Sequence, residues 1–374
     1  MKGKPMPTLA IMLALLIAMV LPMGPGVGEA GQVGSTYKVL APISRGNLTI
    51  FPVVSDRTHD TRGFLTLDEG VRSGEVVVSE AGGMRPLVRR RQDYIPGDGA
   101  EVNRLVLINN SDRPLILLAG EIVTGGKQDR VVGKDRIVPP KSDPIDLEVF
   151  CVEPGRWVAS KPEFGSFNSQ MAQPSVRRSA MADQDQQKVW SEVHATAQSL
   201  AVQASPGAAG AIGGTSSYAG VMANDEVRRR VDSVAVPIEQ SYLGLMRELR
   251  ARNAVGVVVA VNDRIIWADV FASTSLLEKY WPKLIRSYAA EALTYHPGYV
   301  RFPKGEGSWV KGERPDMKDA QAFLDDFGAR HEVEESEPGV FRRTELTGPD
   351  FTAFALTALL PGTGFDVHIA KMAD

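Results

Sequence analysis

Residues 103–130 read NRLVLINNSDRPLILLAGEIVTGGKQDR, and residues 151–157 read CVEPGRW. The first stretch combines short apolar, often β-branched runs with Gly, Pro, Asn and Asp, and the second has Pro and Gly where a predicted strand ends, a pattern typical of strands joined by turns. Polar and aromatic side chains stand at the ends of these runs, where sheet geometry can bring them together: Glu121, Lys127, Gln128, Arg130, Glu153, Arg156 and Trp157. We expect this group to be either a polar binding site or a structural ion network.

The same pattern extends over residues 37–157, which we interpret as a β-rich part of the chain. Asn110 to Pro114 form a turn signal, because Asn and Asp bond their own backbone and Pro presets φ. We expect this turn to join two strands as a hairpin within a sandwich-like antiparallel layer. Thr66 is suited to cap a short helix over residues 67–72. The strands predicted in this part cover residues 48–54, 75–79, 104–109, 115–124, 130–133 and 145–152.

Helices are predicted in the middle of the chain and antiparallel strands at its C-terminal end. Apolar residues spaced three and four apart predict a helix over residues 183–203, and Pro237 suits the first turn of another. Residues 173–179 look irregular. Further helices are expected over 224–233, from Ser273 or Thr274 to 288, and over 316–330, and strands over 254–261, 264–271, 331–335, 340–346, 351–360 and 365–370. Strands first and last with helices between them predict an α+β fold.

The first thirty residues have the three-part pattern of a secretory signal. Lys2 and Lys4 precede an apolar run over residues 9–23, and small residues end at Ala30. We therefore expect cleavage after Ala30 and export to the periplasm, the cell surface or the medium. The alternative is an uncleaved membrane anchor, although this run is shorter than the ~20 residues that a bilayer span needs. No later segment is long and apolar enough to predict a span.

Residues 31–374 are predicted to form a single elaborated α+β domain. Its parts are the β-rich residues 37–157, a mobile loop over residues 204–223, and a helix-and-strand part over residues 224–370. The loop is predicted because Gly, Ala and Ser offer little apolar area against the entropy of ordering them. An exported chain with one Cys cannot form an internal disulfide, so packing and hydrogen bonding must hold this domain together.

Charge and motif content exclude several functional classes. The chain has 42 basic and 45 acidic residues and a net charge of −3, so no concentrated basic field predicts a nucleic acid or a membrane surface as partner. The sequence lacks a nucleophile elbow, a phosphate-binding P-loop, a dinucleotide fingerprint and a zinc-protease motif. Its five histidines are scattered. We therefore predict neither a metal site nor a cofactor, and interpret Asp56, His59 and Asp60 as turn residues rather than cation ligands.

The paired glycines Gly125 and Gly126 predict a bulge or tight turn between two strands. Such features often lie beside functional sites because they re-aim side chains. Lys127, Gln128 and Arg130 would then supply donors suited to carboxylate or phosphate groups. The alternative, which stays open, is that Arg130 pairs with Glu121 and the bulge only closes a sheet.

The segment from Cys151 to Trp157 ends another predicted strand. Cys151 and Glu153 fall on the same face, and a neighbouring carboxylate makes a thiol a poor nucleophile. We therefore expect Cys151 to be a small buried apolar residue. Glu153 and Arg156 either form an ion pair covered by Trp157, or Trp157 presents its ring to a ligand.

Several sequence blocks together resemble one domain family. They are Leu118 to Glu121, Gly125 to Arg130, Val138 to Pro140, Cys151 to Trp157, Ala268 to Phe271 and Leu284 to Tyr288. The family is described as associated with ADP-ribosylglycohydrolase (ARG) and rhodanese-phosphatase-superfamily proteins, and the resemblance extends over nearly all of residues 37–368. It implies a genomic link to ADP-ribose or NAD-derived metabolites, and it brings no catalytic residue assignment with it.

Three functional hypotheses follow, and whether the protein is an enzyme stays open among them. The first is an exported domain that binds an anionic small molecule or a protein partner through Lys127, Gln128, Arg130, Arg156 and Trp157. The second is a hydrolase of a phosphorylated or ADP-ribosylated substrate, with Glu121 or Glu153 as general base and an arginine holding the anion. The third is a structural envelope-associated protein whose polar residues serve stability alone.

Overall fold

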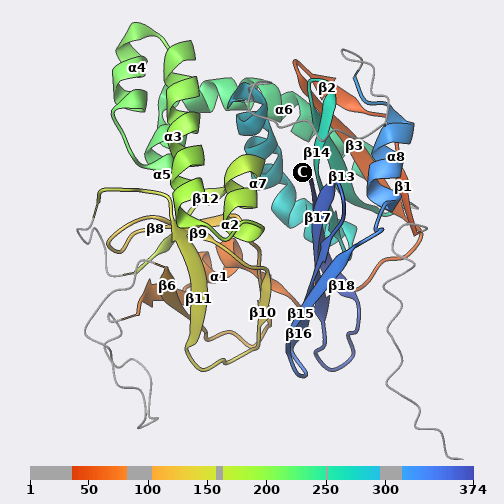
Figure 1. The fold of residues 1–374 in the computed structure, drawn as a ribbon. Helices are drawn as coiled ribbons and strands as arrows, with labels where there is room; N and C mark the ends of the chain where they lie inside the picture. The colour runs from red at the N-terminus through yellow and green to blue at the C-terminus, as the bar shows by residue number, and fades with distance from the viewer. Residues whose placement is uncertain (1–35, 82–102, 157–162, 250–251, 295–313) are drawn as a thin grey trace, which may run out of the picture.

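Two groups of β-strands lie on either side of a central helix, α7 (Thr274–Thr294) (Figure 1). The structure is a computed structural model of the chain, and it describes residues 36–81, 103–156, 163–249, 252–294 and 314–374. The helices and the largely antiparallel sheets confirm the predicted α+β class.

The larger group of strands is a nine-stranded antiparallel sheet in which N-terminal strands pair with C-terminal ones. The strand order is β1-β3-β13-β14-β18-β17-β16-β15, and β2 pairs with β3 beside this path. Its strands are β1 (Tyr37–Val39), β2 (Ile43–Arg45), β3 (Leu48–Ser55), β13 (Ala254–Val261), β14 (Arg264–Phe271), β15 (His331–Glu337), β16 (Phe341–Thr347), β17 (Phe351–Ala358) and β18 (Asp366–Ala373). The predicted hairpin of β13 and β14 is confirmed, whereas the pairing of β3 with β13 joins residues two hundred positions apart.

The smaller group consists of two sheets built from the middle of the β-rich part. One has the order β12-β8-β9-β11-β6-β5 and the other the order β10-β7-β4. Their strands are β4 (Leu65–Thr66), β5 (Val76–Glu80), β6 (Arg104–Asn109), β7 (Leu115–Leu117), β8 (Glu121–Thr124), β9 (Arg130–Val132), β10 (Arg136–Val138), β11 (Ile145–Cys151) and β12 (Gly165–Met171). Only β4 and β7 pair in parallel among the described strands.

The hairpin expected around residues 110–114 is wrong, although the turn itself is present. β6 pairs with β11 and β5, whereas β7 pairs with β10 and β4 in the other sheet. The side chain of Asn109 organises this corner by donating to the carbonyls of Arg113 at 2.8 Å and Pro139 at 3.0 Å. A buried amide that bonds two backbone segments, residues 111–113 and 138–139, turns the chain into the next sheet instead of back along the same one.

The helices begin where short polar side chains can bond the free amides of the first turn. In α1 the side chain of Thr66 accepts from Glu69 N and the Glu69 side chain accepts from Thr66 N, which confirms the predicted cap. In α3 the side chain of Asp185 accepts from Gln187 N and Lys188 N. The helices are α1 (Leu67–Ser73), α2 (Pro174–Met181), α3 (Gln186–Gln203), α4 (Pro206–Gly213), α5 (Tyr218–Ala223), α6 (Asp225–Glu248), α7 and α8 (Met317–Asp325). Pro237 lies inside α6 and does not begin it.

Two further expectations about the middle of the chain are wrong. Residues 173–179 were expected to be irregular but lie largely in α2, which buries Val176, Ala180 and Met181. Residues 204–223 were expected to be a loop but form α4 and α5. Few large apolar side chains mark these helices in the sequence, so their periodicity is weak. Proline at the first turn of α2 and α4 and a Ser217 cap on α5 are the local signals that they carry.

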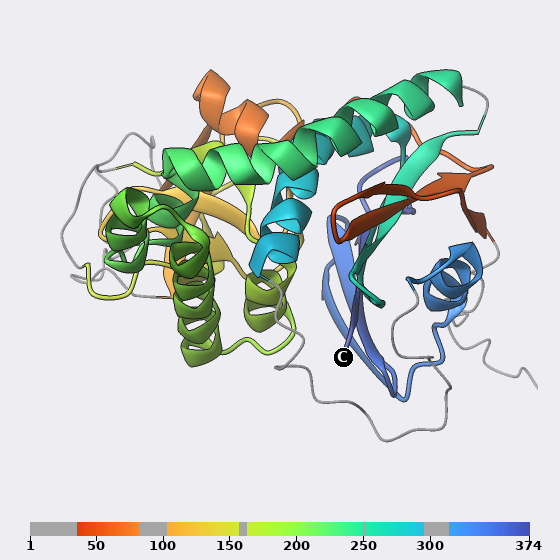
Figure 2. The same ribbon diagram turned by 90° about the horizontal axis from the view of Figure 1, so that it is seen from above.

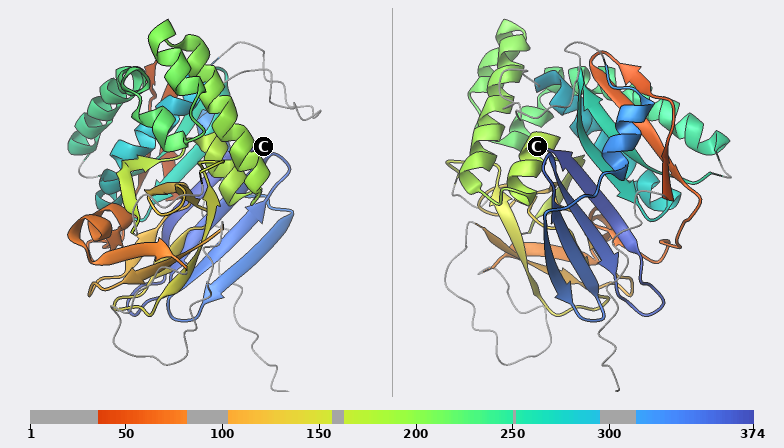
Figure 3. Two further views of the ribbon diagram at one scale, coloured as in Figure 1. Left: turned by 90° about the vertical axis from the view of Figure 1, so that its left-hand side faces the viewer. Right: turned by 45° about the vertical axis from the view of Figure 1, so that its right-hand side comes forward.

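Helices cover both faces of the large sheet (Figures 2 and 3). Trp281 and Leu284 of α7 pack with one face of β13, and Ala320 and Leu324 of α8 pack in a separate cluster on the other face. β13 is therefore buried along its whole length, as its apolar sequence requires. Within the described residues, no helix has both the length and the apolar character needed to cross a bilayer.

Candidate functional site

The turn between β8 and β9 has a backbone that only glycine adopts without strain. Gly125 has φ 136° and Gly126 has φ 49°. A Cβ atom at Gly126 would lie 2.2 Å from Phe164 Cζ and 2.5 Å from Glu80 Oε1. The turn that the paired glycines predicted is therefore present, and it is pressed against the end of β5.

Two carboxylates hold the backbone of this turn in place. Lys127 N donates to Glu80 Oε1 at 2.7 Å, and Gly125 N donates to Asp129 Oδ1 at 3.1 Å. Glu80 is the last residue of β5, and both carboxyl-bearing residues are at least nine-tenths buried. Backbone amides that point at buried carboxylates make this turn rigid without any contribution from large apolar side chains.

Antiparallel pairing of β9 with β11 brings residues 151–156 beside this turn. Arg130 is opposite Cys151 in the ladder, and Val152 N donates to Asp129 O at 3.0 Å. Asp129 N donates to Glu153 Oε2 at 3.2 Å, and Gln128 Nε2 donates to Glu153 O at 3.2 Å. We call the resulting group the glycine-loop cluster: Glu80, Gly125, Gly126, Lys127, Gln128, Asp129, Arg130, Glu153, Arg156 and Ser217.

Arg156 is the cation that closes the cluster. Its Nη2 lies 2.6 Å from Glu153 Oε2 and 3.4 Å from Asp129 Oδ1. The same guanidinium donates to the carbonyl oxygen of Gly126 at 3.2 Å and to that of Gly125 at 3.5 Å. The Arg156 side chain keeps 26% of its surface exposed, so an oriented positive charge reaches solvent at the rim. Lys127 is also partly exposed.

Burial changes the proton affinities inside the cluster. Burial, aided by the nearby charge of Glu153, raises the pKa of Asp129 above its ordinary value. The Glu153 carboxylate raises the pKa of Arg156, which stays charged. Burial lowers the pKa of Arg130, whose side chain is fully enclosed. The cluster therefore contains a carboxyl that takes up a proton more readily than an exposed aspartate does.

Cys151 is enclosed beneath the cluster. It is 0% exposed, and burial raises the pKa of its thiol. Its Sγ accepts a hydrogen bond from Glu153 N at 3.3 Å. A thiol that is inaccessible and slow to ionise is not a nucleophile, which confirms the prediction of a small buried residue.

Ser217 joins the cluster from the segment in which only a loop was expected. Its hydroxyl donates to Asp129 Oδ2 at 3.4 Å and accepts from Gly220 N at 2.9 Å as the cap of α5. Tyr218 N donates to Val152 O at 2.9 Å beside it. The Gly- and Ala-rich helices are thus docked on the glycine-loop cluster by a hydroxyl that no sequence motif marks.

A family model described as "ARG and Rhodanese-Phosphatase-superfamily-associated Protein domain", or ARPP-1, matches residues 36–371. This match covers nearly the whole chain. The chain belongs to the ARPP-1 family. Neither the curated proteins nor the solved structures that were compared with it include a match. The resemblance inferred from the sequence blocks is therefore confirmed at the level of the family.

The ARPP-1 domain places Glu121 in a different ion network from the other predicted site residues. Glu121 is 1% exposed; its Oε1 is paired with Lys283 of α7, and its Oε2 accepts from Leu118 N at 2.8 Å. Lys283 Nζ also lies 2.8 Å from Asp68 Oδ2 and 4.4 Å from the centre of the Tyr280 ring. Burial opposes the charge of Lys283, but the two carboxylates outweigh it and raise the pKa of this lysine.

Glu121 does not pair with Arg130, so that alternative is wrong. Its partner Lys283 lies 162 positions along the chain, in a helix whose pattern indicated only core packing. Lys127, Gln128, Arg130, Glu153 and Arg156 do come together. Trp157 lies outside the described residues, and the choice between ring stacking and covering the ion pair remains a prediction.

A second buried network in the ARPP-1 domain joins the two groups of strands. Arg177 of α2 makes two parallel bonds of 2.9 and 3.0 Å to Asp269 of β14. His368 of β18 contacts Asp269 Oδ1 at 2.9 Å through Nε2 and Asp135 Oδ2 at 2.7 Å through Nδ1. Asp135 in turn accepts from Ala119 N at 2.7 Å. These side chains have no more than 1% of their surface exposed, so the network stabilises the interior and is not offered to a ligand.

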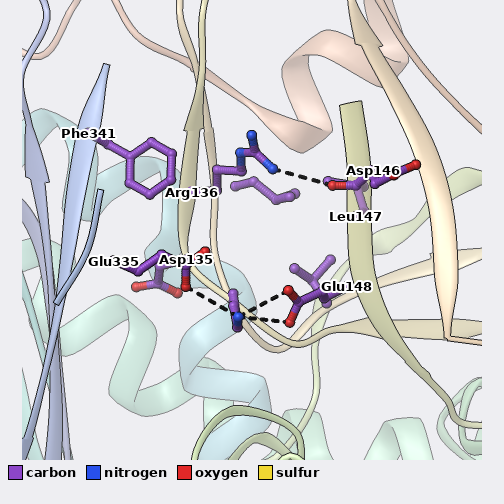
Figure 4. Close-up of a pocket in the computed structure, with 10 residues that line it drawn as sticks. Asp135, Arg136, Asp146, Leu147, Glu148, Glu335 and Phe341 are labelled. Carbon is purple, nitrogen blue, oxygen red and sulfur yellow. Dashed lines mark hydrogen bonds and ion pairs between the residues drawn. The ribbon is translucent and has the colours of Figure 1, made fainter. Parts of the chain in front are cut away.

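Two surface pockets lie away from the glycine-loop cluster. One of about 40 Å³ lies between β9–β11 and β15–β16, where Lys134 bridges Glu148 and Glu335 (Figure 4). It has room for roughly one to a few water molecules. The other, of about 310 Å³, is lined by Thr58, His59, Asp60, Arg62, Asn253 and Ser273 to Ser275. The described residues contain no group of His, Cys, Asp and Glu side chains arranged to hold a metal ion.

Proposed function

We propose that this ARPP-1 domain binds an anionic small molecule at the glycine-loop cluster. The observation that carries the proposal is Arg156. Its guanidinium is held by two carboxylates and two loop carbonyls, and the side chain as a whole still keeps 26% of its surface exposed. A cation that is already ordered loses little conformational entropy when an anion arrives, which favours binding.

The cluster also contains acceptor oxygens that the described residues do not satisfy. Gln128 Oε1 and Glu80 Oε2 are buried and have no hydrogen-bond partner in the part of the chain that the structure describes. Buried acceptors in proteins are usually satisfied by protein, water or ligand donors. A ligand that combines a negative charge with hydroxyl groups fits this mixture of arginine, lysine and carbonyl oxygen.

A nucleotide of the ADP-ribose class has that combination. Its diphosphate suits Arg156 and Lys127, because guanidinium and ammonium groups bind phosphate oxygens with charge-assisted bonds. Its ribose hydroxyls suit the carboxylate of Glu153, whose side chain is 13% exposed. The description of the family, which associates it with ARG proteins, supports testing this class first.

Isothermal titration calorimetry on residues 31–374 tests the proposal with ADP-ribose, NAD and inorganic phosphate as separate titrants. We expect saturable heat with ADP-ribose that weakens as salt rises, because a surface cation is screened. Absence of heat with every titrant, checked by equilibrium dialysis, would remove the small-ligand function. A protein partner at the same cluster would then be the remaining form of the binding hypothesis.

A hydrolase is the second candidate, and Asp129 is the observation that favours it. Its raised pKa beside Glu153 resembles the separation of acid and base roles between neighbouring carboxyls in hydrolytic sites. Glu153 would act as general base and Asp129 as general acid, with Arg156 holding the anion. The fully enclosed Glu121 cannot reach a substrate in this structure.

Glu153→Gln and Asp129→Asn separate catalysis from binding. If the protein hydrolyses ADP-ribosylated or phosphorylated substrates, each variant should lose activity by about 10²-fold or more while it still binds the product. Retention of full activity by both variants would exclude these two carboxyls. Circular dichroism and urea unfolding on the same samples control for loss of the fold.

We also propose that residues 1–30 direct export and are then removed. The basic start, the apolar run and the small residues before Ala30 support this proposal. Intact-mass measurement of the protein from fractionated cells tests it: a mature form that starts at Gly31 outside the cytoplasm is expected. A full-length form that stays with the cytoplasm would contradict it.

A further inference from the structure

Strand β15 forms one edge of the nine-stranded sheet. It pairs with β16 along all seven of its residues, from His331 opposite Thr347 to Glu337 opposite Phe341, and no other described strand pairs with it. Six of its seven residues are exposed. Figure 3 shows this hairpin at the border of the sheet. An exposed edge strand presents backbone N–H and C=O groups to which a further strand can bond.

The side chains of β15 are acidic on both faces of the strand. On one face, Glu335 Oε2 lies 3.2 Å from Lys134 Nζ, and Glu337 Oε2 lies 2.9 Å from Arg136 Nη2 (Figure 4 labels Glu335 and Arg136). The protein itself thus shows how this strand binds cations: each of these two alternate carboxylates pairs with a basic side chain of the segment 134–136, and Glu335 also lies 3.8 Å from Arg343 Nη1 of β16. The spacing of the two basic residues, Lys134 and Arg136, matches that of the two acids.

The opposite face repeats this arrangement without partners from the described residues. Glu332 and Glu334 are two positions apart and exposed, and no side-chain hydrogen bond or ion pair joins either of them to the described chain. Val333, which lies between them in the sequence and points to the other face, keeps 45% of its surface exposed, one of few large apolar side chains to do so in the described part of the molecule. The edge thus presents Glu-Val-Glu to solvent, with open backbone groups alongside.

We propose that β15 is a docking edge for an extended, basic segment of a partner protein, which adds to the sheet as a further strand. Alternate Lys or Arg side chains of that segment pair with Glu332 and Glu334, and an apolar side chain between them packs on Val333. Cross-strand neighbours of opposite charge stabilise such a pair of strands. Main-chain bonds supply affinity and the alternating side chains supply specificity, as in other strand-addition complexes.

Charge complementarity selects this occupant over a second copy of the same chain. Two β15 edges would place carboxylates opposite carboxylates, which is destabilising. A charged edge that served only to prevent aggregation would bind neither a copy nor a peptide. A docking edge for a basic strand, a self-association edge and an edge that only prevents aggregation would each bind a different set of peptides of defined charge and backbone.

Fluorescence anisotropy with labelled peptides tests the proposal on the whole mature chain. The probe is Lys-Val-Lys-Val-Lys with blocked ends, and the controls are Glu-Val-Glu-Val-Glu and Lys-Pro-Lys-Pro-Lys. The proline peptide keeps the charge but cannot pair as a strand, because proline has no N–H. We expect saturable binding of the lysine–valine peptide alone, with increased hydrogen-exchange protection confined to β15 and its partner β16.

Matched double variants test whether the peptide binds at the β15 edge. The double substitution Glu332→Gln and Glu334→Gln should weaken binding of the lysine–valine peptide by about five- to tenfold at low salt, since two cross-strand pairs are lost. Glu248→Gln with Glu278→Gln, which removes two exposed carboxylates from α6 and α7, should leave affinity unchanged. Equal binding of the proline peptide, an equal effect of both double variants, or absence of binding would each overturn the proposal.

Discussion

Arg156 Nη2 lies 2.6 Å from Glu153 Oε2, and this pair closes the turn between β8 and β9 against the end of β11. The arginine reaches back to the carbonyls of the two glycines, while the glutamate accepts from the backbone of Asp129. Each member therefore orients the other and the loop together. The proposed site depends on this geometry, because it is what keeps a partly exposed cation in one position.

Gly126→Ala should destabilise the protein more than Gly46→Ala does. Both glycines have positive φ, but a Cβ at Gly46 meets nothing within 4 Å, whereas one at Gly126 would collide with Phe164 and Glu80. We expect a loss of about 1 kcal/mol of unfolding free energy at Gly46, from backbone strain alone. At Gly126 we expect about 3 kcal/mol or more, because overpacking is added. Equal losses in urea unfolding would mean that the turn is not pressed against β5.

Arg177→Met should lower the free energy of unfolding strongly. The change leaves Asp269 as a buried carboxylate without its bidentate partner, and breaking a buried pair in this way costs about 3–5 kcal/mol. Arg228→Met is the control, because Arg228 pairs with Asp225 on the surface of α6 and should change stability little. A urea midpoint for Arg177→Met that matches the control would show that the network does not stabilise the interior.

Stability should fall as the pH rises toward 9 because of His368. Burial opposes its charge, but Asp135 and Asp269 outweigh burial and raise its pKa from 6.5 to about 9. The folded-state value is the higher one, so the stabilisation is complete below pH 6.5 and is lost as the pH rises through 9. The loss amounts to about 3 kcal/mol by proton linkage.

Urea unfolding between pH 6 and pH 10 measures this effect. In His368→Asn the free energy of unfolding should depend less on pH over that range. His194→Asn, at an exposed position of α3, should show the same pH dependence of unfolding free energy as the parent protein. A parent whose stability stays constant or rises between pH 6.5 and 9 would contradict the charged state assigned to His368.

Glu121→Gln should lower stability without changing the affinity of the folded protein for its ligand. The substitution removes a buried negative charge from Lys283 and leaves Asp68 as the remaining partner, a change we expect to cost about 2–4 kcal/mol. Ligand affinity is measured below the unfolding midpoint by calorimetry. A selective loss of affinity at full stability would place Glu121 in the binding site instead.

Local sequence patterns predicted those parts of the fold that local physics determines. The Thr66 cap of α1 and the apolar runs of β13 and β14 appear as predicted because each depends on neighbours in the chain. The helices α4 and α5 were missed, since Ala and Gly give no apolar stripe from which periodicity can be measured. Their stability comes instead from tertiary contacts such as that of Ser217 with Asp129.

Long-range partners could not be predicted from the sequence. The meeting of Asp129 with Glu153 follows from the pairing of β9 with β11, and residues 127–130 and 153–156 converge as sheet geometry was expected to allow. The pairing of Glu121 with Lys283, or of Arg177 with Asp269, joins elements whose relative placement only the packed core decides. A glutamate in a strand has the same sequence signature whether it binds a ligand or a buried lysine.

The most direct test of the account is calorimetry of ADP-ribose binding to Arg156→Met beside Arg136→Met. Both arginines are partly exposed and paired with a glutamate, with 26% and 30% of the side chain exposed, but only Arg156 belongs to the glycine-loop cluster. We predict that Arg156→Met weakens binding by about tenfold or more, as loss of a charge-assisted bond implies, while Arg136→Met binds like the parent. Unchanged affinity in Arg156→Met, with the fold intact, would contradict the proposed site.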